Sequence, residues 1–268
     1  MHRIEFDLVV CGGGLSGLCG AILAARQRLR VALVQDRPVL GGNASSEVRI
    51  HTHGAGTYWP WAVETGVLAE MIDEERFRNP EPVFEGSVNA ICDLVFYDWA
   101  IREKMLTLFM NASVRAVKLA ASLPRQIAAV HCSQLGSEKE FELAAPLFID
   151  ATGDGTVAAL AGADWRMGRE ARGEFNEPKA PPIADRVTQG STIQFRARDL
   201  GRAAPFIPFD WAERYPDEAS AYSRGHDNPL GGYWWIEIGS PFDTLADNEA
   251  IRHELIRHVL GVFDHLKN

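Results

Sequence analysis

The chain has 268 residues, of which 46% are hydrophobic and 24% are charged, a balance that is ordinary for a globular protein able to bury a sizeable core. Its formal net charge of −9, with no long basic block, argues against a nucleic-acid partner. The apolar stretch Leu8–Ala25 is interrupted by glycines, so we interpret it as a packed strand and helix rather than as a signal or membrane segment. We expect a cytoplasmic protein without membrane contact.

Residues 7–36 have the pattern of a strand, a helix and a second strand. The first strand is expected over Asp7–Cys11, a helix of small residues over Leu18–Ala25, and the second strand over Arg30–Val34. The run Gly12–Gly17 between the first strand and the helix satisfies G-x-G-x-x-G. This order of elements is the context that a dinucleotide-binding fingerprint requires, whereas an ordinary Gly-rich turn is the alternative.

Each glycine of the fingerprint has a separate mechanical role. Gly12 allows a tight turn out of the strand, Gly14 lets the backbone approach a pyrophosphate, and Gly17 lets the helix pack closely on the strand. The helix N-terminus adds unpaired N–H groups and a partial positive charge. The residues expected at the phosphates are Gly12, Gly13, Gly14, Leu15, Ser16 and Gly17.

The position after the second strand departs from the usual fingerprint. An acidic residue normally meets the ribose hydroxyls there, but this chain has Gln35 followed by Asp36. The amide of Gln35 can still bind a hydroxyl, and Asp36 can take part of the role. The Gly-rich turn alone does not distinguish FAD from NAD, because both present an ADP half to it.

Later motifs favour FAD. The loop 37–46 contains Leu-Gly-Gly-Asn, and the apolar strand Leu147–Asp150 runs into Ala-Thr-Gly-Asp-Gly; between them lie a strand-like run, Leu106–Val114, and the runs 127–134 and 140–143. In this order they resemble the FAD-dependent oxidoreductases of the glutathione-reductase-like superfamily. The resemblance implies an α/β fold, with a Rossmann-like FAD-binding domain that has a parallel sheet and a β-meander, followed by part of an α+β substrate domain.

The resemblance also implies which residues contact FAD. The loop after the second strand would run alongside the flavin, the turn after Leu147–Asp150 would lie at the phosphates and ribose, and the backbone of Val114 would meet the adenine. Beyond the Gly-rich turn, the implied residues are Gln35, Asp36, Arg37, Gly41, Gly42, Asn43, Ser45, Ser46, Val114, Thr152, Gly153 and Asp154. For Asn43, Ser45, Ser46 and Asp154, helix capping is the alternative role.

A narrower resemblance, to a family of generically described bacterial FAD-dependent oxidoreductases, rests on residues 35–47 and 161–163 and runs through the whole chain. In the superfamily the chain normally returns to the FAD domain after the substrate domain, and no such segment follows Asn268. We therefore expect the N-terminal part of a longer protein or a divergent short form. Its expected partners are a small-molecule substrate and either a missing C-terminal segment or further copies of the chain in a homo-oligomer.

The expected organisation has two parts. Residues 1–170 would form the FAD-binding domain, with a largely helical insertion at 58–99, and residues 171–268 would form the partial substrate domain. The elements expected in the second part are strands within Gly190–Arg198 and Tyr233–Ile238 and a helix over Asp243–Leu266. Asp243 or Thr244 is the expected cap of that helix.

Redox chemistry is expected to pass directly between a substrate and the flavin. The dithiol reductases of the superfamily carry two cysteines in the segment that corresponds to Asn43–His51, which contains none here. His51 or His53 could be the base for the proton that accompanies hydride transfer. If this run is a strand, Arg49 shares their face and could stabilise an anionic reduced flavin. A structural role for the histidines is the alternative.

These features predict an FAD-dependent oxidoreductase that transfers a hydride from a small organic substrate to the flavin. The four cysteines have no C-x-x-C or metal-ligand spacing, so they predict free thiols and neither a disulfide framework nor a metal site. The alternatives are an NAD-dependent dehydrogenase and a truncated, non-catalytic FAD- or nucleotide-binding scaffold.

Overall fold

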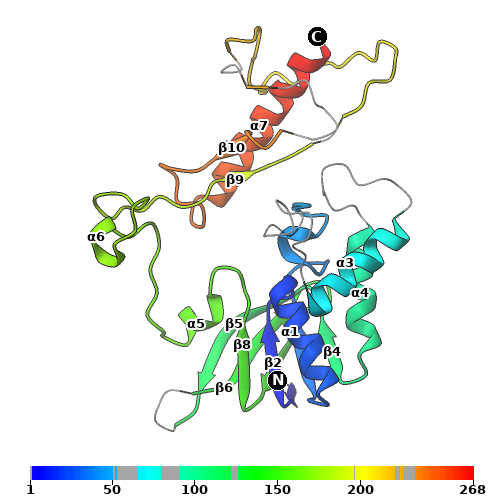
Figure 1. The fold of residues 1–268 in the computed structure, drawn as a ribbon, viewed down its shortest axis with the longest axis vertical. Helices are drawn as coiled ribbons and strands as arrows, with labels where there is room; N and C mark the ends of the chain where they lie inside the picture. Colours follow the sequence, from blue (N-terminus) through cyan, green and yellow to red (C-terminus); the bar gives the residue numbers. More distant parts are fainter. Residues whose placement is uncertain are drawn as a thin grey trace. The chain divides into compact units, whose positions relative to one another are not determined.

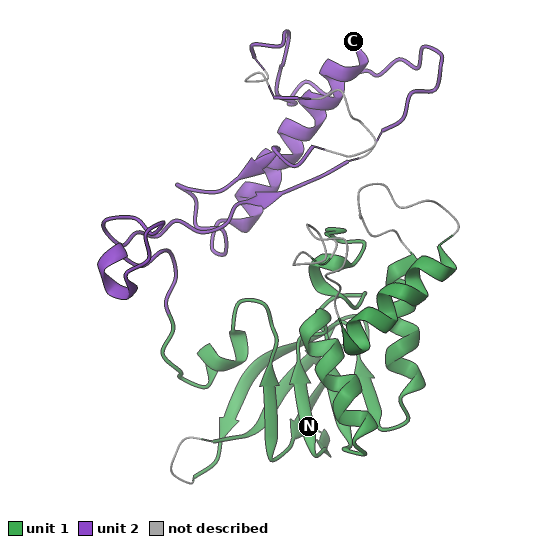
Figure 2. Ribbon diagram, in the orientation of Figure 1, with its two compact units in different colours: residues 1–165 green, residues 166–268 purple. Residues whose placement is uncertain are grey.

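The structure is a computed structural model that describes residues 2–50, 52, 65–79, 91–121, 126–195, 197–220, 224–225 and 233–268. The chain divides into two compact units, Met1–Trp165 and Arg166–Asn268 (Figure 2). Each unit has a hydrophobic core of its own.

The first unit is built on a four-stranded parallel sheet (Figure 1). Its strands are β2 (Leu8–Cys11), β3 (Val31–Val34), β4 (Leu106–Phe109) and β8 (Leu147–Asp150), in the order β4-β3-β2-β8. Helix α1 (Leu15–Arg26) connects β2 to β3. Every residue of β2 and β3 is buried, as expected for a parallel strand that is covered on both faces. The order β4-β3-β2 is that of one half of a Rossmann fold, and β8 adds a fourth strand beside β2.

A second, four-stranded sheet contains the β-meander. Its three antiparallel strands are β5 (Ala112–Leu119), β6 (Ile127–Gln134) and β7 (Lys139–Ala144), and the N-terminal strand β1 (His2–Glu5) pairs in parallel with β7. The predicted meander is therefore present, with β1 added to its edge.

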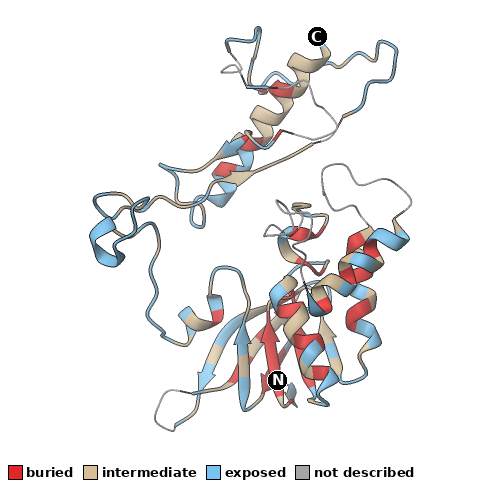
Figure 3. Cartoon of the chain, viewed as in Figure 1, coloured by how far each residue is buried: buried red, intermediate tan, exposed pale blue. Residues whose placement is uncertain are grey.

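The residues of β2 alternate between two cores. Leu8 and Val10 pack with apolar residues of three helices, α1, α3 (Gly66–Arg78) and α4 (Ile91–Arg102). Val9 and Cys11 point to the opposite face and pack with apolar residues of the meander. The parallel sheet is thus the middle layer between helices and meander, and Figure 3 shows buried residues concentrated on β2 and on the helices beside it.

The prediction of one strand over Leu106–Val114 is wrong. β4 ends at Phe109, a turn follows, and β5 begins at Ala112 in the other sheet. The chain turns at Asn111, whose φ of 54° lies in the left-handed region that asparagine tolerates better than most residues. The apolar pattern continues through the turn, so it does not reveal the change of sheet.

The second unit is smaller and less regular. Its elements are α6 (Arg172–Phe175), the antiparallel pair β9 (Ser191–Thr192) and β10 (Glu237–Ile238), and α7 (Asn248–Lys267). Its core consists of Tyr233, Ile236, Ile251, Leu255 and Val262. Across the described ranges, no helix combines the length and hydropathy needed to cross a bilayer.

The last helix begins later than expected, and its predicted cap does not cap it. α7 starts at Asn248, with Asp247 as its N-cap residue. The carboxylate of Asp243 instead accepts hydrogen bonds from the amides of Leu245 and Ala246, each at 3.0 Å, and closes a separate turn before the helix. An aspartate can close a turn or cap a helix by the same local hydrogen bond, so the sequence does not separate the two.

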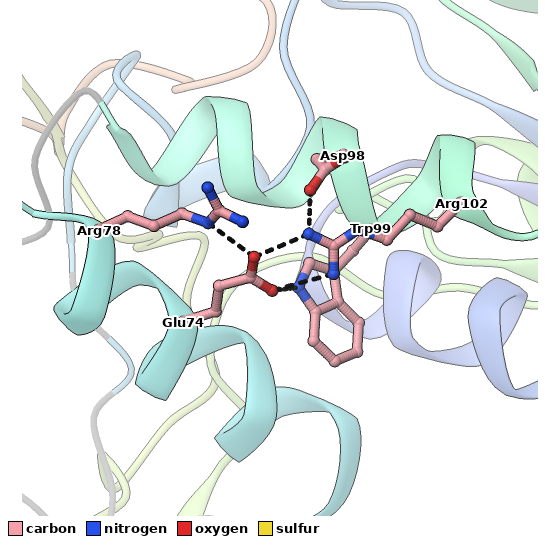
Figure 4. Close-up of polar contacts among 5 residues, drawn as sticks. All are labelled: Glu74, Arg78, Asp98, Trp99 and Arg102. Atoms are coloured by element: carbon pink, nitrogen blue, oxygen red, sulfur yellow. Dashed lines mark hydrogen bonds and ion pairs between the residues drawn. The ribbon is translucent and has the colours of Figure 1, made fainter.

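Helices α3 and α4 are joined by a polar cluster around Glu74 (Figure 4). Its carboxylate accepts hydrogen bonds from Arg78 and Arg102, both at 2.7 Å, and from the indole N–H of Trp99 at 2.6 Å. Arg102 also pairs with Asp98. These bonds, that of Arg102 above all, lower the pKa of Glu74 from 4.5 to about 2. The ionised form of Glu74 therefore stabilises the contact between the two helices.

We expect Glu74→Gln to lower the free energy of unfolding by about 1 kcal/mol at pH 7, since it removes the charge from a partly exposed network. The pKa of Glu74 is lower in the folded chain than in the unfolded one, so its contribution is complete above pH 4.5 and is lost as the pH falls towards about 2. The stability difference between the two proteins, measured by urea unfolding, should therefore shrink over that range. A constant difference from pH 7 to pH 3 would contradict this role. Glu70→Gln is the control, because Glu70 lies on the same helix as Glu74 and forms only a longer ion pair, of 3.8 Å, with Arg26 of α1.

Candidate functional site

Three loops of the first unit meet at the carboxyl ends of the parallel strands. They follow β2, β3 and β8, the three neighbouring strands in the sheet. The amide of Gly12 donates to the carbonyl of Val34 at 2.7 Å, and the amide of Ala151 donates to that of Cys11 at 2.7 Å, so the loops leave the sheet side by side. In open α/β sheets, nucleotides bind at this edge, where the strand order reverses.

Two glycines of the fingerprint are required by the protein's own backbone. Gly12 has a φ of +104°, and a Cβ there would lie 2.0 Å from the carbonyl oxygen of Ala151. A Cβ on Gly17 would lie 1.9 Å from the carbonyl oxygen of Gly12. Any side chain at either position would displace backbone, so both glycines hold α1 tightly against β2 and the turn after β8.

Gly14 differs from these two glycines. Its φ of −62° suits any residue, and the nearest described atom to a Cβ there is the Cα of Gly42 at 4.0 Å. The packing of the protein therefore does not require glycine at this position. A methyl group would instead occupy the space in front of the first turn of α1, where a ligand's phosphate would lie.

The first turn of α1 can bind an anion. Gly14 is its N-cap residue, no acidic residue lies in the first turn, and within the described part of the chain no side chain caps it. The amides of Leu15, Ser16 and Gly17 belong to the donors that an α-helix leaves without a partner at its start. Their partial positive charge and the space beside Gly14 fit a pyrophosphate.

The loop after β3 packs on the Gly-rich turn. The amide of Gly41 donates to the carbonyl of Gly13 at 2.8 Å, and Gly14 forms a parallel bridge with Gly41. Gly41 has a φ of +107°, and a Cβ there would lie 2.5 Å from the ring of Phe96 in α4. The Leu-Gly-Gly motif is therefore fixed between the Gly-rich turn and an aromatic ring of the helical layer.

Most of the polar groups predicted after this motif have partners within the protein. Ser45 is fully buried; its hydroxyl donates to the carbonyl of Gly42 at 2.6 Å and accepts from the amide of Glu47 at 3.3 Å. The amide of Ser46 donates to Asp93 of α4 at 2.8 Å. Asn43, in the short 3₁₀ helix η1 (Gly42–Ala44), is exposed. Ser45 thus shapes the loop, and Asn43 presents its side chain to solvent.

A strand from residue 49 was the condition for Arg49 to share a face with the histidines, and the chain does not form one at Arg49. Arg49 has a φ of 64°, and its amide donates to the carbonyl of Ser45 at 2.7 Å, so the chain closes a turn there. The alternation of side chains along a strand therefore does not relate Arg49 to the histidines. His51 and His53 lie outside the described residues.

Gln35 lies inside the site, with 4% of its surface exposed. Its Oε1 accepts from the amide of Gly13 at 2.8 Å, and its Nε2 donates to the carbonyl of Val39 at 2.9 Å. Both ends of the amide that was expected to bind a ribose hydroxyl thus have partners in the protein. Asp36 and Arg37 are exposed, and Arg37 lies 3.7 Å from the carboxylate of Glu47.

The turn after β8 is organised by Asp150, which lies outside the predicted cofactor-binding residues. Its carboxylate accepts from the amide of Thr152 at 3.1 Å, from the hydroxyl of Thr152 at 2.6 Å and from the amide of Ala158 at 2.7 Å. The hydroxyl of Thr152 in turn accepts from the amide of Thr156 at 2.7 Å, at the start of α5 (Thr156–Leu160). The side chains of Asp150 and Thr152 therefore cap α5.

Asp154 does not cap that helix, as one interpretation of the sequence expected. The N-cap residue is Gly155, and the amide of Asp154 donates to the carbonyl of Thr152 at 3.0 Å. Asp154 and Gly153 are exposed beside the turn. An aspartate that ends a strand two residues before a threonine is the signal that could have identified Asp150, because its carboxylate reaches the amide two residues on.

Val114 belongs to the meander, and its strand is tied to the site. The amide of Ala112, at the start of β5, donates to the backbone carbonyl of Gln35 at 2.8 Å. Val114 pairs with Cys132, and the register then shifts before Ala116. Such an irregularity leaves backbone groups out of the regular ladder, as a backbone contact with an adenine requires.

All four cysteines are free thiols, and three of them are buried. Burial raises the pKa of Cys92 and of Cys132 to about 12, and raises that of Cys11 further. Burial also raises the pKa of the half-buried Cys19. Because the thiolate is the reactive form, these cysteines are poor nucleophiles at neutral pH.

The chain matches the family described as FAD dependent oxidoreductase over residues 7–261. It is similar to THI4 of Thermovibrio ammonificans, with 20% identity and a TM-score of 0.43 over 67% of this chain and 76% of that one. It is also similar to a geranylgeranyl bacteriochlorophyll reductase-like protein of Thermoplasma acidophilum (14% identity, TM-score 0.42, 60% of this chain and 43% of that one). A third similar structure is L-proline dehydrogenase of P. horikoshii (19% identity, TM-score 0.34, 56% of this chain and 23% of that one).

The chain spans less than half the length of the last two proteins. No curated protein matches it. The family match covers most of the chain and confirms the predicted family and the predicted cofactor, FAD. The chain belongs to the FAD dependent oxidoreductase family.

Proposed function

We propose that the chain binds FAD across the first turn of α1, as part of an enzyme that oxidises a small organic substrate by direct hydride transfer. The observation that carries this proposal is the uncapped first turn of α1 beside Gly14, at a position where the protein's own packing leaves room for a ligand. Bound FAD would supply the group that accepts the hydride, while the protein binds and orients both partners.

The proposed contacts follow from the exposed groups of the three loops. The amides at the start of α1 would bind the pyrophosphate, and Gly42, whose φ is +57°, would let the next loop approach it. Asn43 and Asp154, both exposed, would bind hydroxyl or ring groups of the cofactor. The backbone at Val114 would meet the adenine.

Direct hydride transfer from substrate to FAD is consistent with the positions and the pKa values of the cysteines. The segment from Asn43 to His51 contains no cysteine, and the cysteines elsewhere have raised pKa values that disfavour the thiolate. A relay through a redox-active pair of thiols is therefore disfavoured. The two electrons would leave the substrate together as a hydride, and the accompanying proton would pass to a base of the protein.

His51 and His53 are the proposed bases, because they follow the loop that packs on the Gly-rich turn and because histidine accepts a proton near neutral pH. Arg49, half-buried in the turn that Ser45 closes, is proposed to stabilise negative charge on the reduced cofactor. These roles rest on position along the chain and on residue type.

We further propose that the first unit is of the glutathione-reductase-like type and that the second unit is part of a substrate domain. The parallel sheet with a meander on one face and helices on the other supports the first point. Four free thiols support a reducing, cytoplasmic location.

Gly14→Ala and Gly17→Ala test the phosphate site as a matched pair. We expect Gly14→Ala to change the stability of the FAD-free chain by no more than about 1 kcal/mol, because its φ is ordinary and its Cβ has room. Its Kd for FAD should rise at least about tenfold, because the methyl group would occupy the place of a phosphate. Gly17→Ala should instead destabilise the FAD-free chain by about 3 kcal/mol, since its Cβ meets backbone.

Urea unfolding and titration with FAD measure the two effects. If Gly14→Ala binds FAD as tightly as the parent, the cofactor does not lie against this turn.

The absorption spectrum of the purified protein tests the chemistry. We expect the visible flavin bands, released FAD by mass, and bleaching of the bands under anaerobic conditions by an oxidisable substrate. His51→Ala and His53→Ala should each retain FAD, and the one that removes the base should slow reduction at least about 100-fold. Asp73→Asn, an exposed change on α3, is the control. Reduction of both histidine variants at the parent's rate would exclude both as the base.

A further inference from the structure

Gln35 is a buried side chain that links two loops of the site, and we call it a strut for that reason. It stands at the end of β3, where an acidic residue commonly binds the ribose hydroxyls of a dinucleotide. Here the side chain points inward and is almost fully buried. Through the two hydrogen bonds of its amide it joins Gly13 of the Gly-rich turn to Val39 of the next loop, at 2.8 and 2.9 Å.

The two partners determine which way the amide points. The N–H of Gly13 can only donate and the carbonyl of Val39 can only accept, so one end of the side chain must accept and the other must donate. Only an amide provides both at neutral pH, whereas an ionised carboxylate has two accepting ends. A glutamate here would place a negative oxygen against the carbonyl of Val39 in a buried site, which is costly.

The strut fixes the groups that surround the proposed cofactor. Gly13 directly precedes the N-cap residue of α1, and Val39 directly precedes the Leu-Gly-Gly motif. A Cβ on Gly13 would lie 2.6 Å from Leu40 and 3.0 Å from the Cβ of Gln35, so the turn is packed closely around this side chain. Backbone bonds of Gln35 to Phe109 and Ala112, at 2.9 and 2.8 Å, anchor it to the turn between β4 and β5.

We infer that Gln35 is a positioning residue for FAD rather than its ribose ligand, and that the exposed carboxylate of Asp36 recognises the ribose hydroxyls instead. This inference rests on the proposed function. Asp36 directly follows Gln35, lies in the bend that begins the loop after β3, and is exposed. A carboxylate can accept hydrogen bonds from both hydroxyls of a ribose.

Gln35→Glu separates this inference from the usual fingerprint. If Gln35 were the ribose ligand, glutamate would restore the common residue, and FAD would bind at least as tightly with no loss of stability. If Gln35 is a strut, the 268-residue variant should show an FAD-free Tm lower by about 5 °C and a Kd for FAD raised about tenfold. Tight binding of FAD by Gln35→Glu at an unchanged Tm would overturn the positioning role.

The pH dependence of the Tm of Gln35→Glu distinguishes the strut from a general packing defect, which would lower the Tm equally at every pH. The introduced carboxyl, once protonated, would regain a donor for the carbonyl of Val39, so its pKa should be raised in the folded chain. The Tm deficit of Gln35→Glu relative to the parent should then be largest near pH 8 and should shrink as the pH falls towards 5. A deficit that is the same at both pH values would contradict the strut.

Asp36→Asn tests the second half of the inference at an exposed position, where folding is not affected. We expect an unchanged Tm and a Kd for FAD raised about tenfold, because the charged acceptor for the ribose is lost. Asp73→Asn removes one charge from another exposed carboxylate and is the control. Equal affinities of the two variants would overturn the role of Asp36. A parent chain that binds no FAD would instead overturn the proposed function itself.

Discussion

Close backbone packing around the turn after β2 determines where the first amides of α1 lie. Gly12 and Gly17 leave no room for a Cβ, because a Cβ would lie 2.0 Å from the carbonyl oxygen of Ala151 in the first case and 1.9 Å from that of Gly12 in the second. The helix therefore starts directly against the sheet. Gly14, which could accommodate a side chain, lies on the side that the packing leaves open. Gly12 and Gly17 are thus required for folding. Gly14 is instead required for the space that a ligand would occupy in front of the helix.

The loops after β3 and β8 are held by polar side chains that form hydrogen bonds within the protein. Four of these side chains are of types that bind nucleotides in many proteins: Gln35, Ser45, Asp150 and Thr152. Each of them instead forms hydrogen bonds with the backbone of a loop. The groups that remain for a ligand are mainly backbone amides and the exposed side chains between these residues. Gln35 and Ser45 are buried, so the loss of either one's partners would cost more than the loss of an exposed hydrogen bond, and this favours a rigid loop after β3.

Much of the fold could be predicted from local patterns. The spacing of Gly12, Gly14 and Gly17 between an apolar strand and a helix indicates the βαβ unit. A side chain at these positions would block the tight turn, the approach of a pyrophosphate or the close packing of the helix. The partners of Gln35 could not be predicted, since they depend on how the loop at Val39 returns over the Gly-rich turn. The break at Asn111 and the turn at Arg49 could not be predicted either. The apolar pattern continues through the first, and both residues adopt φ values that their residue types allow but do not require.

Titration calorimetry of the purified 268-residue chain with FAD, repeated in the presence of excess ADP, tests the central claim most directly. The account predicts that about one FAD binds per chain and that ADP competes for the site, because the ADP half would lie on the first turn of α1. A well-folded chain that takes up neither molecule, or that binds FAD without competition from ADP, would contradict it.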